Sequence, residues 1–154
     1  MLDKMTRSSV AFELHGEPRG KGRPRFIRKT GHPYTPERTA VYESALCLAG
    51  QKAMEGRAIL EGPLSVTVEA IFQPAASWPE KRKAAALLGI EWPTKKPDCD
   101  NILKCLDALN GVVWIDDKQI VTLMITKRYA KTPMLRIIVE TLRLVQLNAH
   151  LQEM

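Results

Sequence analysis

Four segments of the chain alternate apolar and polar side chains with a period of two residues. Near the N-terminus, Val10, Phe12 and Leu14 alternate with small or polar residues. In a β-strand this alternation places the apolar side chains on one face, so it is typical of a strand with one side in the core. The same pattern recurs along the chain and predicts strands over residues 9–15, 64–72, 119–128 and 134–140.

Two segments between these strands begin with helix start signals. Thr35 followed by Pro36 fits an N-cap and a first helical residue, and the following residues predict a helix to about Met54. Residues 77–80, Ser-Trp-Pro-Glu, match the capping box, in which the serine accepts from a backbone N–H and the glutamate reaches back. This pattern predicts a second helix that ends at about Leu88.

A third helix is predicted over residues 101–109, with Asp100 as its N-cap and Gly111 as the left-handed residue after it. At 100° per residue, Lys104 and Asp107 fall near Asp100 on a polar face. The opposite, apolar face comprises Ile102, Leu103, Leu106 and Leu109. One side of this helix should therefore face the core, and the opposite side should carry the charged residues.

The order of these elements indicates an α+β fold, because strands cluster at both ends of the chain around the helices. A length of 154 residues suits a single domain over 1–154 with a core over about 9–140. The tail, 141–154, fits a short helix, a frayed end or an oligomer contact, and the pattern does not choose among these.

Composition is that of a globular protein, with 45% hydrophobic and 26% charged residues. No apolar run approaches the ~18 residues of a membrane span, and no apolar segment of a secretory signal follows the first residues, so we expect a cytoplasmic protein. The three cysteines form no Cys-x-x-Cys pair, which argues against a zinc site and a disulfide framework. The net charge of +6 predicts a polyanionic partner, either nucleic acid or an anionic membrane.

Basic side chains concentrate in two segments. The first, "GKGRPRFIRK", surrounds Phe26 with Lys21, Arg23, Arg25, Arg28 and Lys29. It is either a solvated charged loop or an arm that grips phosphate, since guanidinium groups match phosphate oxygens and glycines allow close backbone approach. The second segment is the first turn of the predicted helix after Pro79, with Lys81, Arg82 and Lys83.

Acidic side chains gather in "KPDCDNILKCLDALNGVVWIDD", which contains Asp98, Asp100, Asp116 and Asp117. A predicted short strand over 112–115 returns the last two acids toward the first two if it runs back beside the helix. A cap, an Asp100–Lys104 ion pair and a polar turn explain part of this set, but they leave surplus acids. A divalent metal would explain the surplus, because Mg2+ is bound by a few carboxylates together with water and phosphate oxygens.

Two other metal sites are excluded by the residues. An EF-hand loop needs oxygen ligands and a glycine where Ile102 and Leu103 stand. A manganese-dependent nucleotide-sugar transferase could use the Asp-x-Asp pair, but it would not account for the arginine-rich segment.

Together these residues resemble a known pattern. "KPDCDNILKCLDALNGVVWIDDKQI" resembles the signature of the RusA family of Holliday junction resolvases of bacteria and phages. "GKGRPRF", "YTPERTAVYE" and "SWPEKRKAAAL" also resemble this family, especially its phage-type members, so the likeness covers roughly residues 10–128.

The resemblance implies a homodimeric, RusA-like endodeoxyribonuclease, a hydrolase that uses Mg2+, with Mn2+ as a substitute. Such an enzyme resolves Holliday junctions in DNA recombination and repair by paired symmetric nicks. Its partners would be branched DNA and a second copy of the chain, with neither a membrane nor a disulfide-linked partner. The other function considered is a structure-selective DNA-binding protein without catalysis.

The family's functional residues transfer to matching positions of this chain. Asp98, Asp100 and Asp117 match the metal-binding acids, with Asp116 as a further candidate, and Lys104 matches the essential lysine. One departure is that Asp107 follows Lys104 by three residues, with a turn after the helix that is shorter than in some members. The residues expected to hold DNA are Lys21, Arg23, Arg25, Arg28, Lys29, Lys81, Arg82, Lys83, Lys95 and Lys96.

Overall fold

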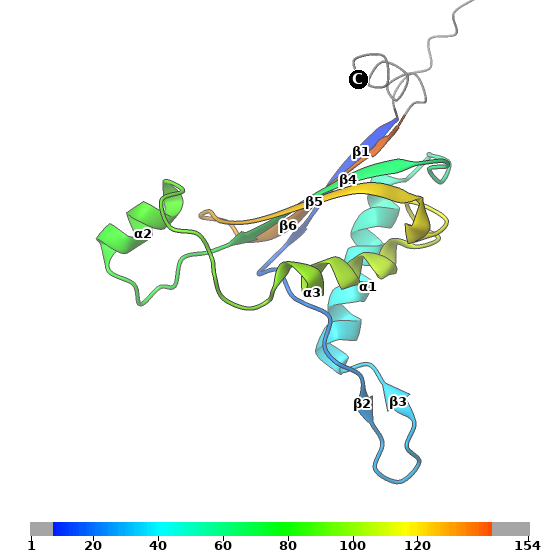
Figure 1. Cartoon of the computed structure of the whole chain (residues 1–154), viewed down its shortest axis with the longest axis horizontal. Helices are drawn as coiled ribbons and strands as arrows, with labels where there is room; N and C mark the ends of the chain where they lie inside the picture. The colour runs from blue at the N-terminus through cyan, green and yellow to red at the C-terminus, as the bar shows by residue number, and fades with distance from the viewer. Residues whose placement is uncertain (1–7, 143–154) are drawn as a thin grey trace, which may run out of the picture.

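The structure, a computed structural model, describes residues 8–142 and has a four-stranded sheet as its centre (Figure 1). The strand order is β1-β6-β4-β5. The strands are β1 (Ser9–His15), β4 (Leu64–Phe72), β5 (Ile120–Tyr129) and β6 (Met134–Thr141). The helical elements are α1 (Glu37–Ala53), α2 (Glu80–Leu87), α3 (Cys99–Leu103) and the 3-10 helices η1 (Lys104–Leu109) and η2 (Asp117–Gln119). A hairpin of β2 (Arg25–Phe26) and β3 (Pro33–Tyr34) projects away from the sheet.

The predicted α+β class is confirmed, and the sheet is mixed. β6 pairs antiparallel with β1 and β4, whereas β5 runs parallel to β4 at the edge of the sheet. The four predicted strands are present with ends within one residue. Of the tail whose structure was left open, residues 143–154 lie outside the described part. Within residues 8–142, no helix has the length and apolar character to cross a membrane.

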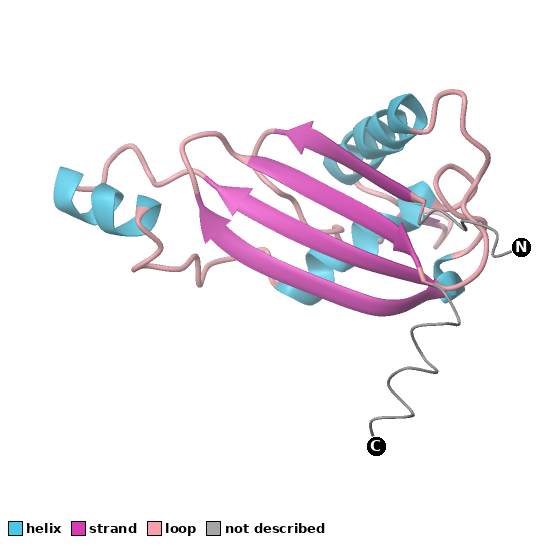
Figure 2. Ribbon diagram, turned by 90° about the horizontal axis from the view of Figure 1, so that it is seen from above, coloured by secondary structure: helices cyan, strands magenta, loops and turns pink. Residues whose placement is uncertain are grey.

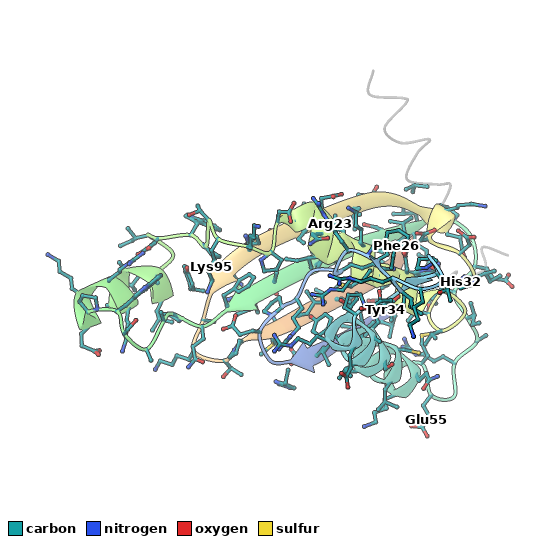
Figure 3. The ribbon with its side chains drawn as sticks, turned by 90° about the horizontal axis from the view of Figure 1, so that it is seen from below. Arg23, Phe26, His32, Tyr34, Glu55 and Lys95 are labelled. Carbon is teal, nitrogen blue, oxygen red and sulfur yellow. The ribbon has the colours of Figure 1, made fainter. Side chains whose placement is uncertain are left out.

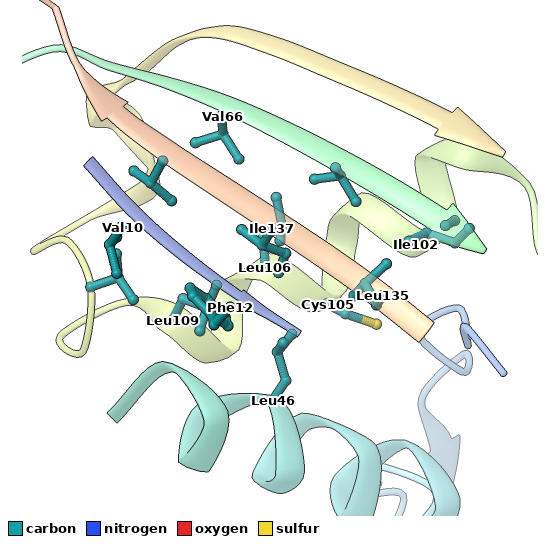
Figure 4. Packing of buried hydrophobic residues seen from close by; sticks show 14 of the residues in the cluster. Val10, Phe12, Leu46, Val66, Ile102, Cys105, Leu106, Leu109, Leu135 and Ile137 are labelled. Carbon is teal, nitrogen blue, oxygen red and sulfur yellow. The ribbon is translucent and has the colours of Figure 1, made fainter. Parts of the chain in front are cut away.

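One face of the sheet is covered by α1 and by the α3–η1 segment, which lie on the same side (Figure 2). Figure 4 shows Leu46 of α1 and Ile102, Leu106 and Leu109 of the α3–η1 segment packed beneath the strands. Leu46, Ile102 and Leu109 are completely buried, as is Val66 in β4. The α3–η1 segment is therefore anchored through its apolar side, as its sequence predicts.

The other face of the sheet has a row of charges across all four strands. Arg136 of β6 lies between two acids, with its guanidinium 3.0 Å from Glu13 of β1 and 2.8 Å from Glu69 of β4. Arg128 of β5 extends the row, 3.6 Å from Glu69. Cross-strand pairs of opposite charge each stabilise a sheet by about 0.2–1 kcal/mol, so this face is held by polar contacts rather than by a second core.

The predicted capping of α1 and α2 is wrong. Thr35 does not cap α1, and the capping box of residues 77–80 is not formed. Instead Pro36 and Pro79 occupy the N-cap positions with extended ψ angles of 141° and 149°. The carbonyl of each proline accepts the first helical hydrogen bonds, so each helix begins one residue after its proline. Proline lacks a donor but keeps this acceptor, which is what an N-cap needs.

The predicted start of the third helix is also wrong, since the helix begins at Cys99 rather than Asn101. Asp98, with ψ of 158°, is the N-cap, and its carbonyl accepts from the backbone N–H of Ile102 at 3.1 Å. Asp100 therefore lies in the first turn and does not cap. From Lys104 onward the helix tightens into η1, a change of winding that the residue types do not indicate.

Residues 112–115, predicted as a strand, form a turn with a single bridging residue. The backbone N–H groups of Val112 and Val113 both donate to the carbonyl of Leu109. Trp114 makes only isolated bridges, to Leu60 and Asn110, and its indole N–H donates to Asn110 Oδ1 at 2.6 Å. The Trp114 indole is completely buried, and its hydrogen bond to Asn110 joins the two ends of the turn. Gly111 takes a left-handed φ of 77°, as predicted.

Two leucines of α1 provide a matched test of this packing. Leu46 is completely buried, whereas Leu48 is 52% exposed. We expect Leu46→Ala to lower the free energy of unfolding by about 2–5 kcal/mol, because it leaves a cavity in the core. Leu48→Ala should change it by less than about 0.5 kcal/mol. Urea denaturation followed by circular dichroism measures both, and equal losses would contradict the packing of α1.

Candidate active site

A cleft of about 1180 Å3 opens between the base of the projecting hairpin, the start of α1 and the start of α3. The hairpin base contributes residues 18–24, α1 contributes Arg38 and Thr39, and the acidic segment contributes its beginning. The side chains that matter for chemistry are Arg23, Arg38, Lys96, Asp98, Asp100 and Lys104. Thus the cleft joins one predicted basic segment to the first half of the acidic segment.

The base of the hairpin is held by backbone contacts at two glycines, where an added side chain would crowd its neighbours. The backbone N–H of Lys21 donates to the carbonyl of Asn101, and that of Gly22 donates to Thr39 Oγ1, both at 3.0 Å. A Cβ atom on Gly20 would lie 2.6 Å from Asn101 Nδ2, and one on Gly22 would lie 2.6 Å from Thr39 Oγ1. The Gly-Lys-Gly sequence thereby fixes the hairpin against both α1 and α3.

Asp98 and Asp100 lie at the start of α3, on the wall of the cleft. The Lys104 Nζ atom is 3.0 Å from Asp100 Oδ2, the ion pair expected from their spacing on the helix. Both side chains of this pair are more than half exposed, so the pair adds little to stability. Its consequence is instead to restrain the Asp100 carboxylate beside the opening of the cleft.

Asp116 and Asp117 form a second acidic group together with Asp107 of η1. Asp116 caps η2 and accepts from the backbone N–H of Lys118 at 2.9 Å, which with its contact to Asp117 holds the pKa of Asp116 below its usual value. The Asp117 carboxyl is hydrogen-bonded to Asp116 and lies close to Asp107, so its pKa is raised. These neighbouring charges make Asp117 retain its proton to a higher pH than an isolated aspartate.

The two acidic groups do not converge into one site within a single chain. Asp117 is not among the residues that line the cleft of Asp98 and Asp100. Within residues 8–142, no set of three or more His, Cys, Asp or Glu side chains is arranged to hold a metal ion. The pair Asp98–Asp100 alone suits Mg2+, which is commonly bound through one or two carboxylates with water and phosphate oxygens as further ligands.

Lys21, predicted to bind DNA, forms ion pairs with two acidic side chains of the protein. Its Nζ atom is 3.2 Å from Glu43 of α1 and 3.3 Å from Asp107. Partial burial opposes the charge of Lys21, but these two carboxylates outweigh it, so the pKa of the lysine is raised. The sequence analysis did not identify Glu43, because only the tertiary fold brings α1 beside residue 21.

The other predicted DNA-binding side chains lie on the cleft, on the hairpin, in α2 and over the Phe72 ring. Lys96 and Arg23 lie on the cleft, and Arg25, Arg28 and Lys29 are exposed on the hairpin. In α2, Arg82 is bidentate to Glu91 and stacks 3.6 Å from the Trp78 ring, and Lys83 pairs with Glu80. The remaining two are Lys81, which is exposed, and Lys95, which lies over the Phe72 ring at 5.4 Å.

A comparison with protein families gives one match, over residues 15–140, to the family described as Endodeoxyribonuclease RusA. This range covers both acidic groups, the cleft and the hairpin. The chain belongs to the RusA family. Its members are endodeoxyribonucleases, and the family is associated with Holliday junction resolution, so the predicted family is confirmed.

The chain is also similar to a curated bacterial protein. Over 137 residues, the chain is 34% identical to "Uncharacterized protein YqaN" of Bacillus subtilis (strain 168). The alignment covers 84% of this chain and 94% of the relative. The two proteins therefore match over most of their lengths.

The Lys21–Glu43 ion pair can be tested by a double-mutant cycle on stability. The variants are Lys21→Met, Glu43→Gln and both together, and we expect a coupling of about 0.5–1 kcal/mol from thermal or urea unfolding. Lys29→Met is the matched control, because Lys29 forms no ion pair within the described residues. A coupling of zero would show that Lys21 does not fasten the hairpin to α1.

Proposed function

We propose that the protein is a Mg2+-dependent, structure-selective endonuclease that resolves Holliday junctions by paired symmetric nicks. The observation that supports it most is the cleft in which the basic hairpin base faces Asp98 and Asp100. The membership of this protein in the RusA family supports the reaction class, which is hydrolysis of a DNA phosphodiester.

The two sides of the cleft have complementary tasks in this reaction. Arg23, Arg38 and Lys96 offer positive charge to a DNA phosphate, which the acids alone would repel. Asp98 and Asp100 would hold the divalent cation, and Lys104 keeps Asp100 in place through its 3.0 Å contact. When bound, Mg2+ supplies an activated water and stabilises the leaving 3′ oxygen.

The separation of the two acidic groups favours a dimeric site. Asp117 is the position expected for the family's third metal-binding acid, yet in one chain its acidic neighbours are Asp107 and Asp116, and it does not line the cleft. We therefore propose that, in a homodimer, Asp117 of a second copy completes the metal site beside Asp98 and Asp100. Two such sites related by a twofold axis suit the two symmetric strands of a four-way junction.

Substitution of the acids tests the assignment directly. Asp100→Asn and Asp117→Asn should each reduce Mg2+-dependent nicking of a synthetic four-way junction by more than about 100-fold, because each removes a metal-binding charge. Junction binding measured in EDTA should persist. Glu55→Gln is the matched control, since Glu55 is exposed and lies away from Arg23 (Figure 3). Equal nicking by the wild type and both variants would refute the site, and binding without nicking by the wild type would favour the non-catalytic function.

Co-expression of two inactive chains tests the shared site. If Asp98 and Asp117 act across the dimer, chains with Asp98→Asn and Asp117→Asn together form one intact site in each mixed dimer. Nicking should then recover to roughly a quarter of the wild-type rate, because half of the dimers are mixed and each keeps one site. If the acids act within one chain, both sites of the mixed dimer are defective and no activity returns.

A further inference from the structure

The projecting hairpin, residues 23–35, is a short antiparallel β-hairpin with two residue pairs rather than an irregular loop. Arg25 pairs with Tyr34 and Phe26 pairs with Pro33 across its two strands. At the tip, the backbone N–H of Ile27 donates to the carbonyl of His32 at 3.0 Å, and that of Gly31 donates to Ile27 at 2.8 Å. Gly31 has a φ of 69°, which closes the turn. The hairpin therefore has a defined backbone path, from which its side chains project.

Large apolar side chains of this hairpin are left in solvent. Every residue from 23 to 35 is exposed, and no other element covers the hairpin (Figure 1). Phe26 is 66% exposed, Ile27 47% and Tyr34 45%. Figure 3 looks onto the hairpin from below, with Arg23, Phe26 and Tyr34 labelled. Exposed apolar side chains gathered on one projecting segment mark a surface that another molecule covers.

The charge around these side chains identifies the kind of molecule. Arg23, Arg25, Arg28 and Lys29 flank Phe26, and the sequence has no acid between Glu17 and Glu37. Within the described residues, these four cations form no ion pairs, unlike Lys21 and Arg82. Unneutralised cations interleaved with exposed aromatic rings are the combination that binds unpaired nucleic acid, with phosphates on the cations and bases on the rings.

The hairpin also rises from the cleft itself, because its base lines the wall opposite Asp98 and Asp100. A strand held in the cleft would therefore continue toward Phe26. A fully paired duplex offers no free base face to a side chain, whereas bases at a branch point can unstack at lower cost.

We propose that the hairpin recognises the branch point of DNA by stacking Phe26 on an unstacked base, while its arginines hold the flanking phosphates. This inference rests on the proposed function for its substrate and adds the residue that distinguishes branched from linear DNA. Phosphate contacts by themselves would bind both forms alike.

The test compares Phe26→Ala with the wild type in EDTA, where binding is measured without cleavage. The probes are a four-way junction with 2-aminopurine at the branch point and a linear duplex of the same sequence. The wild type should raise 2-aminopurine fluorescence by unstacking the base. Phe26→Ala should abolish the rise and weaken junction binding by about 5- to 160-fold, the range for loss of one stacked base, with duplex binding unchanged.

Three further variants sharpen the test. Phe26→Tyr should restore the signal, because it keeps a ring. Arg25→Ala should weaken binding to both DNA forms and reduce the salt dependence by about one phosphate contact. Leu48→Ala removes an exposed apolar side chain from α1 and should change neither binding nor fluorescence.

The inference is overturned if the wild type gives no fluorescence rise, if Phe26→Ala binds the junction as tightly as the wild type, or if it loses junction and duplex equally. The proposed function is tested separately by nicking. A wild type that unstacks the base but never nicks with Mg2+ or Mn2+ supports the hairpin inference and refutes the nuclease. If the wild type nicks junctions and Phe26→Ala still prefers the junction over the duplex as strongly as the wild type, the nuclease is supported and the hairpin inference is refuted.

Discussion

Burial of one side of the α3–η1 segment is the constraint on which the arrangement of the cleft depends. Ile102 and Leu109 are completely buried beneath the sheet, so the segment cannot rotate without exposing apolar surface. Burying a side chain of this size is worth about 1.5–3 kcal/mol, far more than the exposed Asp100–Lys104 ion pair. The hydrophobic core therefore determines which way the acids face, and the ion pair only restrains one of them.

A second constraint joins the basic hairpin to this acidic helix. Because Gly20 and Gly22 lack side chains, the backbone at residues 20–22 lies directly against Asn101 and Thr39. Lys21 adds contacts to Glu43 and Asp107, which makes it a fastening between three segments as well as a cation. DNA held by the hairpin would consequently be held at a set position relative to Asp98 and Asp100.

The charges of the protein divide between those that build it and those that remain available. Arg136, Arg82 and Lys21 each satisfy a carboxylate within the fold. The net charge of +6 does not show where the unpaired positive charges lie. Many of them are on the hairpin and at the cleft. Such a distribution favours contact with a phosphate backbone at one side of the molecule.

The sequence by itself determined the four strands of the central sheet, the class of the fold and the family. Period-two alternation depends only on which side chains face the core, so all four strands were predicted within one residue. The Asp100–Lys104 ion pair was likewise predicted, because it depends only on spacing along one helix, and Asp98 lines the same cleft.

Only the tertiary structure decided the elements whose ends depend on competing local signals or distant partners. Both capping predictions failed because a proline carbonyl at 36 and 79, rather than the preceding hydroxyl, begins each helix. The strand expected over 112–115 became a turn because Trp114 is buried and bonded to Asn110. The segment after this turn brings Asp117 close to Asp107, a result of how the turn packs that the pattern of residue types does not encode.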